Sequence, residues 1–139
     1  MIVPLILLLT ATFAAPAPLS AETTAELSQN PETIKAYVEQ YFAKEPILAD
    51  IAWCESRYRQ WNPDGTVFIG KVNHYDIGVM QVNSLYHDEK ATDLGFDIYS
   101  LSGNLAYAKY LFEKEGSKPW ASSKACWGDK LGNKQVAAK

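Results

Sequence analysis

The chain carries Trp53-Cys54-Glu55-Ser56 and then, after a polar, turn-rich insert, Asp76-Ile77-Gly78-Val79-Met80-Gln81-Val82-Asn83-Ser84. Pro46 can occupy the first turn of a helix, and apolar residues at positions 47, 48, 51, 52 and 54 form a stripe at helical spacing that runs up to Glu55. Glu55 is therefore expected at or near the carboxyl end of a helix.

Helical patterns occur on both sides of this segment. Pro31 opens the first of them, Ser84 can cap the third, and Gly116 stops the last. The apolar spacing predicts helices over residues 31–44, 46–55, 84–90 and 101–115.

A small β element is expected between the second and third helices. Asn62-Pro63-Asp64-Gly65 is a strong turn signal, and residues 66–72 after it are expected to form a hairpin or three short strands. The predicted fold class is α+β, mainly helical with a small antiparallel β element.

The length of 139 residues, 47% of them hydrophobic, suits one domain with its own core. Residues 1–21 contain no charged side chain and include a short apolar run, which is typical of a secretory signal peptide. The expected cleavage site follows Ala21. An uncleaved membrane anchor and a buried apolar segment are the alternatives. We expect a flexible stretch over 22–30, the domain over 31–129, and a polar, mobile tail over 130–139.

Charge and spacing exclude two classes of function. The net charge of −3 lies wholly outside the leader, so the chain lacks the basic footprint of a nucleic-acid-binding protein. Cys54 and Cys126 do not combine with His74 and His87 into any usual zinc-ligand spacing. We expect no metal and no cofactor.

Cys54 and Cys126 are the two cysteines of the chain. In an oxidising compartment they can pair and close a long loop, which is worth roughly 4 kcal/mol in the chain-entropy model. Two separate buried thiols are the alternative. The leader favours the disulfide, and both features favour a secreted or periplasmic protein.

Glu55 has the setting of a candidate general acid. A carboxylic acid stays protonated near neutral pH only where its surroundings disfavour the charge. The nearby aromatic side chains and the negative end of a helix dipole would raise the pKa of Glu55, whereas Arg57 and Arg59 would lower it if they folded back. The aromatic candidates are Trp53, Tyr58 and Trp61.

Asp76 has polar neighbours and is expected to stay ionised, and Gly78 lets a ligand approach closely. One protonated acid and one carboxylate are the equipment of a glycosidase, with a separation of about 5 to 5.5 Å for direct attack and about 6.5 to 9.5 Å for a water between them. The alternative for both side chains is a solvated surface position.

These residues also carry a family resemblance. Cys-Glu-Ser followed by Asp-Ile-Gly-Val-Met-Gln-Val-Asn-Ser resembles the lysozyme-like superfamily, especially soluble lytic transglycosylases with their Glu-Ser and Gly-Leu-Met-Gln signature. The segment from Asp76 to Ser84 is also similar to one in c-type lysozymes. That resemblance implies that Asp76 is a second carboxylate paired with Glu55. Cys-Glu-Ser with a late Trp-Ala-Ser-Ser-Lys-Ala-Cys-Trp resembles resuscitation-promoting factors. Asn104-Leu105-Ala106-Tyr107-Ala108-Lys109-Tyr110-Leu111 is similar to a transglycosylase helix behind the cleft, with Ala108 in place of glycine.

The resemblance implies a lysozyme-like fold with the β element beside a catalytic cleft, and it assigns roles by position. Glu55 would be the general acid and then base, with Asp76 as the second carboxylate. Five residues would support the site or contact the substrate: Ser56, Gln81, Asn83, Tyr86 and Tyr107. A structural hydrogen bond is the alternative for Gln81, and core packing is the alternative for both tyrosines.

The implied activity is cleavage of the β-1,4 bond between N-acetylmuramic acid and N-acetylglucosamine in peptidoglycan, by a lytic transglycosylase or a lysozyme-type hydrolase. The expected partner is the glycan strand and the expected state is a monomer, with no stable membrane span after leader removal. Two other functions stay open. One is a non-catalytic wall-binding module or inhibitor on the same fold, and the other is a chitinase-like hydrolase.

Overall fold

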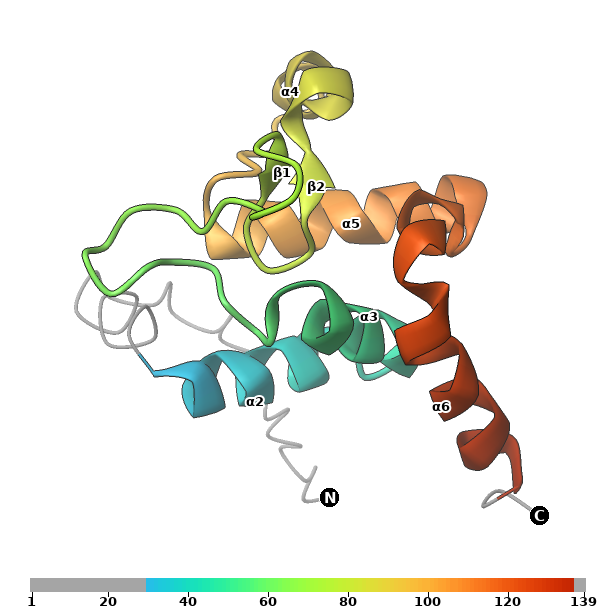
Figure 1. Cartoon of the computed structure of the whole chain (residues 1–139). Coiled ribbons are helices and arrows are strands. Elements are labelled where there is room, and N and C mark those ends of the chain that lie inside the picture. The colour runs from blue at the N-terminus through green and yellow to red at the C-terminus, as the bar shows by residue number, and fades with distance from the viewer. Residues whose placement is uncertain (1–29, 137–139) are drawn as a thin grey trace, which may run out of the picture.

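The computed structural model describes residues 30–136, so the expected leader over 1–21 and nearly all of the flexible stretch over 22–30 lie outside the described residues. The described chain is mainly helical with one two-stranded antiparallel sheet (Figure 1). This confirms the α+β class. In chain order the elements are α2 (Pro31–Tyr41), α3 (Pro46–Ser56), β1 (Asp76–Ile77), β2 (Val82–Asn83), α4 (Ser84–Asp93), α5 (Leu101–Glu115), the 3-10 helix η1 (Lys118–Ser123) and α6 (Lys124–Val136).

Local signals set the bounds of α2 and α3. The Asn30 side chain accepts a hydrogen bond from the Glu32 backbone N–H at 3.0 Å, and proline opens both helices. Helix α3 ends because Arg57 turns into the left-handed region at φ 59°. Both predicted helices are confirmed, although the first stops at Tyr41 and not at residue 44.

The predicted β element is shifted along the chain. Residues 66–72 make only isolated bridges, from Val67 to Trp61 and from Ile69 to Ile77, while the sheet itself is β1 paired with β2. The expectation of strands there was wrong for a physical reason. The Phe68 N–H donates to the Gln60 carbonyl, and the Phe68 carbonyl accepts from the Gly78 N–H. The segment therefore bonds to two different stretches of chain and forms no continuous ladder with either.

Helices α4 and α5 follow the β element, and α5 begins and ends where the sequence predicted. Its Ser100 cap accepts from the Gly103 N–H at 3.1 Å, and Gly116 follows at φ 64°. Ser84 is the first residue of α4 and not its cap, because its hydroxyl donates to the Tyr75 carbonyl at 3.0 Å. Helix α4 also runs three residues further than expected, to Asp93.

The end of the chain differs most from expectation. Residues 130–139 were predicted as a mobile tail, but α6 continues to Val136. The disulfide between Cys54 and Cys126 and the burial of Trp127 fix the start of α6 against α3, and each further residue then adds a backbone hydrogen bond to a formed helix. Residues 137–139 lie outside the described part.

One apolar core joins all the helices. It collects buried side chains from α2, α3, the loop before β2, α4, α5, η1 and α6, among them Leu48, Met80, Ala91, Leu105 and Trp120. The Cys54–Cys126 disulfide, with its sulfurs 2.10 Å apart, links α3 to α6 at the border of this core and confirms the predicted pairing. Within the described range, none of the helices has both the length and the apolar character needed to cross a membrane.

Candidate functional site

A cavity of about 300 Å³ opens between the end of α3, the β element, α4 and η1. Most of its lining residues are polar, which suits a hydrophilic ligand. Its lining includes Glu55, Asp76, Gln81, Asn83, Tyr86, His87, Trp120 and Ser122. The two carboxyl groups that the sequence singled out therefore share one cavity, although they are 21 positions apart in the chain.

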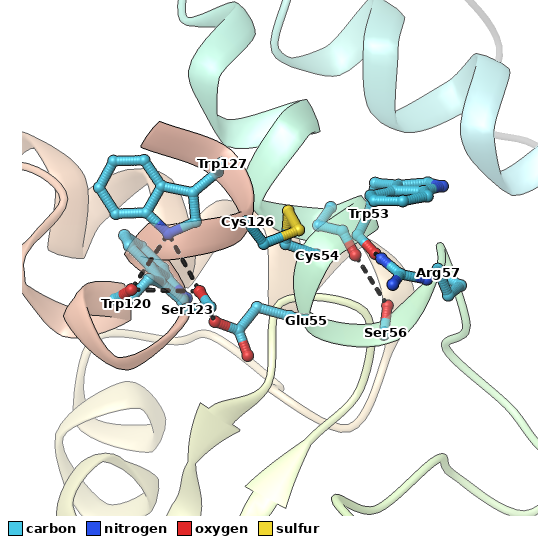
Figure 2. Close-up of a disulfide and its surroundings, with 10 residues drawn as sticks. Trp53, Cys54, Glu55, Ser56, Arg57, Trp120, Ser123, Cys126 and Trp127 are labelled. Atoms are coloured by element: carbon cyan, nitrogen blue, oxygen red, sulfur yellow. Dashed lines mark hydrogen bonds between the residues drawn. A yellow bond between two sulfur atoms is a disulfide. The ribbon is translucent and has the colours of Figure 1, made fainter. Parts of the chain in front are cut away.

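Glu55 stands at the last turn of α3, directly after the disulfide residue Cys54 (Figure 2). Its side chain is partly buried. Burial raises the pKa of Glu55 above its ordinary value of 4.5, and the charge of Asp76 raises this pKa further, while a hydrogen bond from Ser123 lowers it. The net direction is upward, which is what a proton donor requires.

The two arginines near Glu55 do not fold back onto it. Arg57 stacks on Trp53, with its guanidinium carbon 3.6 Å from the ring centroid, and donates to the Trp53 carbonyl at 2.8 Å. Arg59 stacks on Phe68 at 4.1 Å. Figure 2 shows Trp53 and Arg57 on the side of α3 away from the Glu55 carboxyl. The predicted shielding by Trp53 is therefore not what buries Glu55.

Ser123, at the end of η1, forms a hydrogen bond with the carboxyl. Its Oγ donates to Glu55 Oε1 at 2.5 Å, and the Trp127 indole Nε1 donates to Ser123 Oγ at 3.0 Å (Figure 2). Ser123 was not among the site residues predicted from the sequence. One signal was present: Ser123 lies one helical turn before Cys126, and Glu55 follows Cys54, so the disulfide brings the two side chains together.

Asp76 is the first residue of β1, opposite Asn83 of β2. Its Oδ1 accepts from Asn83 Nδ2 at 2.8 Å and from Asn73 Nδ2 at 3.1 Å. Two amide donors therefore fix the direction of this carboxylate at the cavity wall. The Oδ1 of Asn83 is enclosed by protein atoms and has no hydrogen-bond partner among residues 30–136, which leaves an acceptor beside the cavity.

Two fully buried amide side chains hold the loop between β1 and β2. Gln60 Oε1 accepts from the Val79 N–H at 2.8 Å, and Asn104 Oδ1 accepts from the Met80 N–H at 2.9 Å. The same Asn104 donates to the Ile77 and Ile98 carbonyls at 3.0 and 2.7 Å. Because these bonds are shielded from water, they fix the loop that carries Gln81 and joins the strand of Asp76 to the strand of Asn83.

Gly78 is the tightest point of this arrangement. Its φ is 69°, and a Cβ there would lie 2.5 Å from Gln60 Oε1 and 2.8 Å from Asn104 Nδ2. We expect Gly78→Ala to lower the free energy of unfolding by about 3 kcal/mol, since it adds backbone strain and displaces buried hydrogen bonds. Urea unfolding measures this loss.

Gly65→Ala is the matched control for that variant. Gly65 has a similar φ of 82°, but a Cβ there would meet nothing within 4 Å. This control isolates the backbone term, for which we expect about 1 kcal/mol. Equal losses in the two variants would contradict the role assigned to the buried amides.

The other predicted site residues divide into two groups. Gln81, Asn83 and Tyr86 line the cavity, and Tyr86 is 77% exposed, so its ring is free to stack on a ligand. Gln81 also donates to the Gly78 carbonyl at 2.8 Å, which is the structural alternative considered for it. Both roles are therefore open to the same side chain.

Ser56 and Tyr107 lie away from the cavity surface, which corrects their expected contact with substrate. Ser56 is 1% exposed, and its hydroxyl lies at hydrogen-bonding distance from the Ala52 and Val79 carbonyls, so it braces the end of α3. Tyr107 is also 1% exposed, and its hydroxyl lies 3.1 Å from Nδ1 of the cavity residue His87. Both residues support the cavity walls from behind.

Across the described chain, no cluster of three or more His, Cys, Asp or Glu side chains could hold a metal ion. No protein-family model, no curated protein and no solved structure matches this sequence or its fold.

Proposed function

We propose that the protein cleaves the β-1,4 bond between N-acetylmuramic acid and N-acetylglucosamine in peptidoglycan, on a lysozyme-like fold, with Glu55 as general acid and base. The observation that carries this proposal is the position of Glu55. It is a partly buried carboxyl with a raised pKa, in a polar cavity that also holds the Asp76 carboxylate. The resemblance of the Glu-Ser and Gly-Val-Met-Gln segments supports the same reaction.

The first step needs a proton on Glu55. Burial keeps the protonated form populated to a higher pH than for an exposed glutamate, so the carboxyl can give its proton to the glycosidic oxygen as the bond breaks. Positive charge then develops on the muramyl ring. The Asp76 carboxylate, directed by its two asparagine donors, stabilises that charge from the cavity wall.

The second step has two chemically distinct forms. In hydrolysis, a water loses a proton to Glu55 as it attacks the sugar carbon, with Asp76 assisting by stabilising the positive charge, and a reducing end forms. In transglycosylation, the muramyl 6-hydroxyl loses its proton to Glu55 and attacks the same carbon, which gives a 1,6-anhydro sugar. Both forms return the proton to Glu55, so both use the same acid and base.

Binding of a glycan strand is supported by the rest of the lining. Tyr86 offers an exposed ring for the apolar face of a sugar, and polar side chains such as Gln81 line the same cavity and suit sugar hydroxyl and N-acetyl groups. These contacts need neither a metal nor a cofactor. A secreted or periplasmic location would bring the protein to this substrate, and the disulfide favours such a location.

Digestion of purified peptidoglycan tests the proposal. We expect soluble muropeptides, identified by mass spectrometry, and the anhydro product is lighter than the hydrolysis product by one water. Chitin oligomers are digested in parallel, and preferential cleavage of chitin would replace peptidoglycan by N-acetylglucosamine polymers as the substrate. Absence of cleavage of both glycans by the wild-type protein would overturn the enzymatic function.

A further inference from the structure

Ser123 Oγ lies at the centre of three hydrogen-bonding partners. It is 2.5 Å from Glu55 Oε1, 3.0 Å from Trp127 Nε1 and 3.1 Å from the Trp120 carbonyl oxygen (Figure 2). A serine hydroxyl has one hydrogen to donate and two lone pairs that accept. The hydroxyl therefore has two possible acceptors, Glu55 and Trp120, for a single hydrogen.

Each protonation state of Glu55 has a complete arrangement at these positions. When Glu55 is a carboxylate, Ser123 donates to it and accepts from the Trp127 indole. When Glu55 carries a proton, Glu55 donates to Ser123, which accepts from both Glu55 and Trp127 and turns its own hydrogen to the Trp120 carbonyl. The indole N–H also reaches that carbonyl, at 3.1 Å. No partner is left unpaired in either state, and no heavy atom has to move.

We propose that Ser123 is the positioning residue that keeps the Glu55 carboxyl in one orientation through both of its protonation states, by rotating its hydroxyl hydrogen between Glu55 and the Trp120 carbonyl. This inference rests on the proposed function, in which Glu55 must give up a proton and take one back within a single reaction. A carboxyl that turned away between the two steps would lose the geometry of the second.

The surroundings of Ser123 are rigid enough for this role. Trp120 and Trp127 are 3% and 2% exposed, and the Trp120 indole donates to the Met80 carbonyl at 2.9 Å, across the cavity wall. The disulfide fixes Cys126 one turn after Ser123 and Cys54 next to Glu55. Both ends of the Ser123–Glu55 contact are therefore held by covalent and packing constraints on the backbone.

Few other titratable groups share the space around Glu55. Asp76, Tyr86 and His87 line the same cavity, and of these Asp76 is the one whose charge acts on the Glu55 pKa. The two arginines beyond the end of α3 stack on aromatic rings elsewhere. A change in the titration of Glu55 after substitution of Ser123 can thus be assigned to the lost hydroxyl.

The test compares Ser123→Ala with Ser123→Thr, which keeps a hydroxyl, and with Ser102→Ala, an exposed serine of α5 that serves as control. Ser123 itself is not part of the cavity lining, so KM should stay near the wild-type value. We expect Ser123→Ala to lower kcat about tenfold. In the wild type, the hydrogen bond from Ser123 lowers the pKa of Glu55, so its loss should raise that pKa and shift the fall of activity at high pH to a higher pH. Ser123→Thr should keep both kcat and the pH at which activity falls close to their wild-type values.

An activity-independent readout separates this inference from the proposed function. NMR titration of the Glu55 side-chain carboxyl carbon should show a higher pKa in Ser123→Ala than in the wild type and in Ser102→Ala. Equal Glu55 titrations in the wild type and Ser123→Ala would overturn the inference, even if peptidoglycan is cleaved. A fall in kcat that is the same at every pH and accompanies lower thermal stability would also overturn it. If the wild type cleaves no glycan, the proposed function fails, and the inference that Ser123 positions a catalytic acid fails with it. The NMR titration then shows only whether the hydrogen bond from Ser123 controls the protonation of Glu55.

Discussion

Glu55→Gln is expected to lower the rate of peptidoglycan cleavage by about a thousandfold, since the loss of a general acid and base typically costs a factor of 10² to 10⁴. Glutamine has the same shape, and its side-chain oxygen can still accept from Ser123, so the wall of the cavity should stay intact. Release of soluble muropeptides measures the rate. Co-sedimentation with insoluble peptidoglycan measures binding, which should change little.

Glu89→Gln is the control for this variant. Glu89 is an exposed residue of α4 outside the cavity lining, and the same change of charge there should leave the rate unaltered. Full activity of Glu55→Gln would exclude Glu55 as the proton donor. A wild-type protein that binds peptidoglycan but never cleaves it would point instead to a non-catalytic wall-binding module.

Removal of the disulfide is expected to have the largest effect on stability. The double substitution of Cys54 and Cys126 by alanine opens a link between residues 72 positions apart, which the chain-entropy model values at about 4 kcal/mol. Urea unfolding of the double variant, compared with the oxidised wild type, measures this loss. The wild type unfolded in the presence of a reductant should lose a similar amount.

The same variant separates stability from site geometry. Under conditions where the double variant is still folded, α6 is no longer tied to α3, and the contact of Ser123 with Glu55 should loosen. Activity per folded molecule should therefore fall as well. An unchanged unfolding midpoint would show that packing of α6 on α3 suffices without the covalent link.

Most of the helical structure could be predicted because its signals are local. Pro31 and Pro46 open helices, Ser100 and Gly116 bound α5, and the apolar stripes have helical spacing. The β element was misplaced because residues 66–72 have the composition of strands, but their partners are set by tertiary packing. The continuation of α6 was missed because residues 130–136 are mostly polar and carry no apolar stripe at helical spacing, while the helix extends from a start that the disulfide holds against α3.

The candidate site residues show the same difference between local signals and tertiary contacts. Glu55, Asp76, Gln81, Asn83 and Tyr86 reach one cavity as predicted. Tyr107 and Ser56 did not, because the same residue types at the same helical spacing can face either the core or the cavity. Ser123 was missed because its role depends on a contact across 68 positions of the chain, for which no short motif exists.

The cysteine pair also affects when the protein reaches its stable, oxidised form. Disulfides persist in oxidising compartments and are rare where glutathione and thioredoxin keep thiols reduced. A newly made chain in a reducing compartment would therefore lack the link that brings Ser123 to Glu55 and would lose a large part of its marginal stability. For the proposed activity, oxidation after export would then complete the acid site only outside the cytoplasm of the producing cell, so that wall cleavage would begin only after the protein has left its place of synthesis.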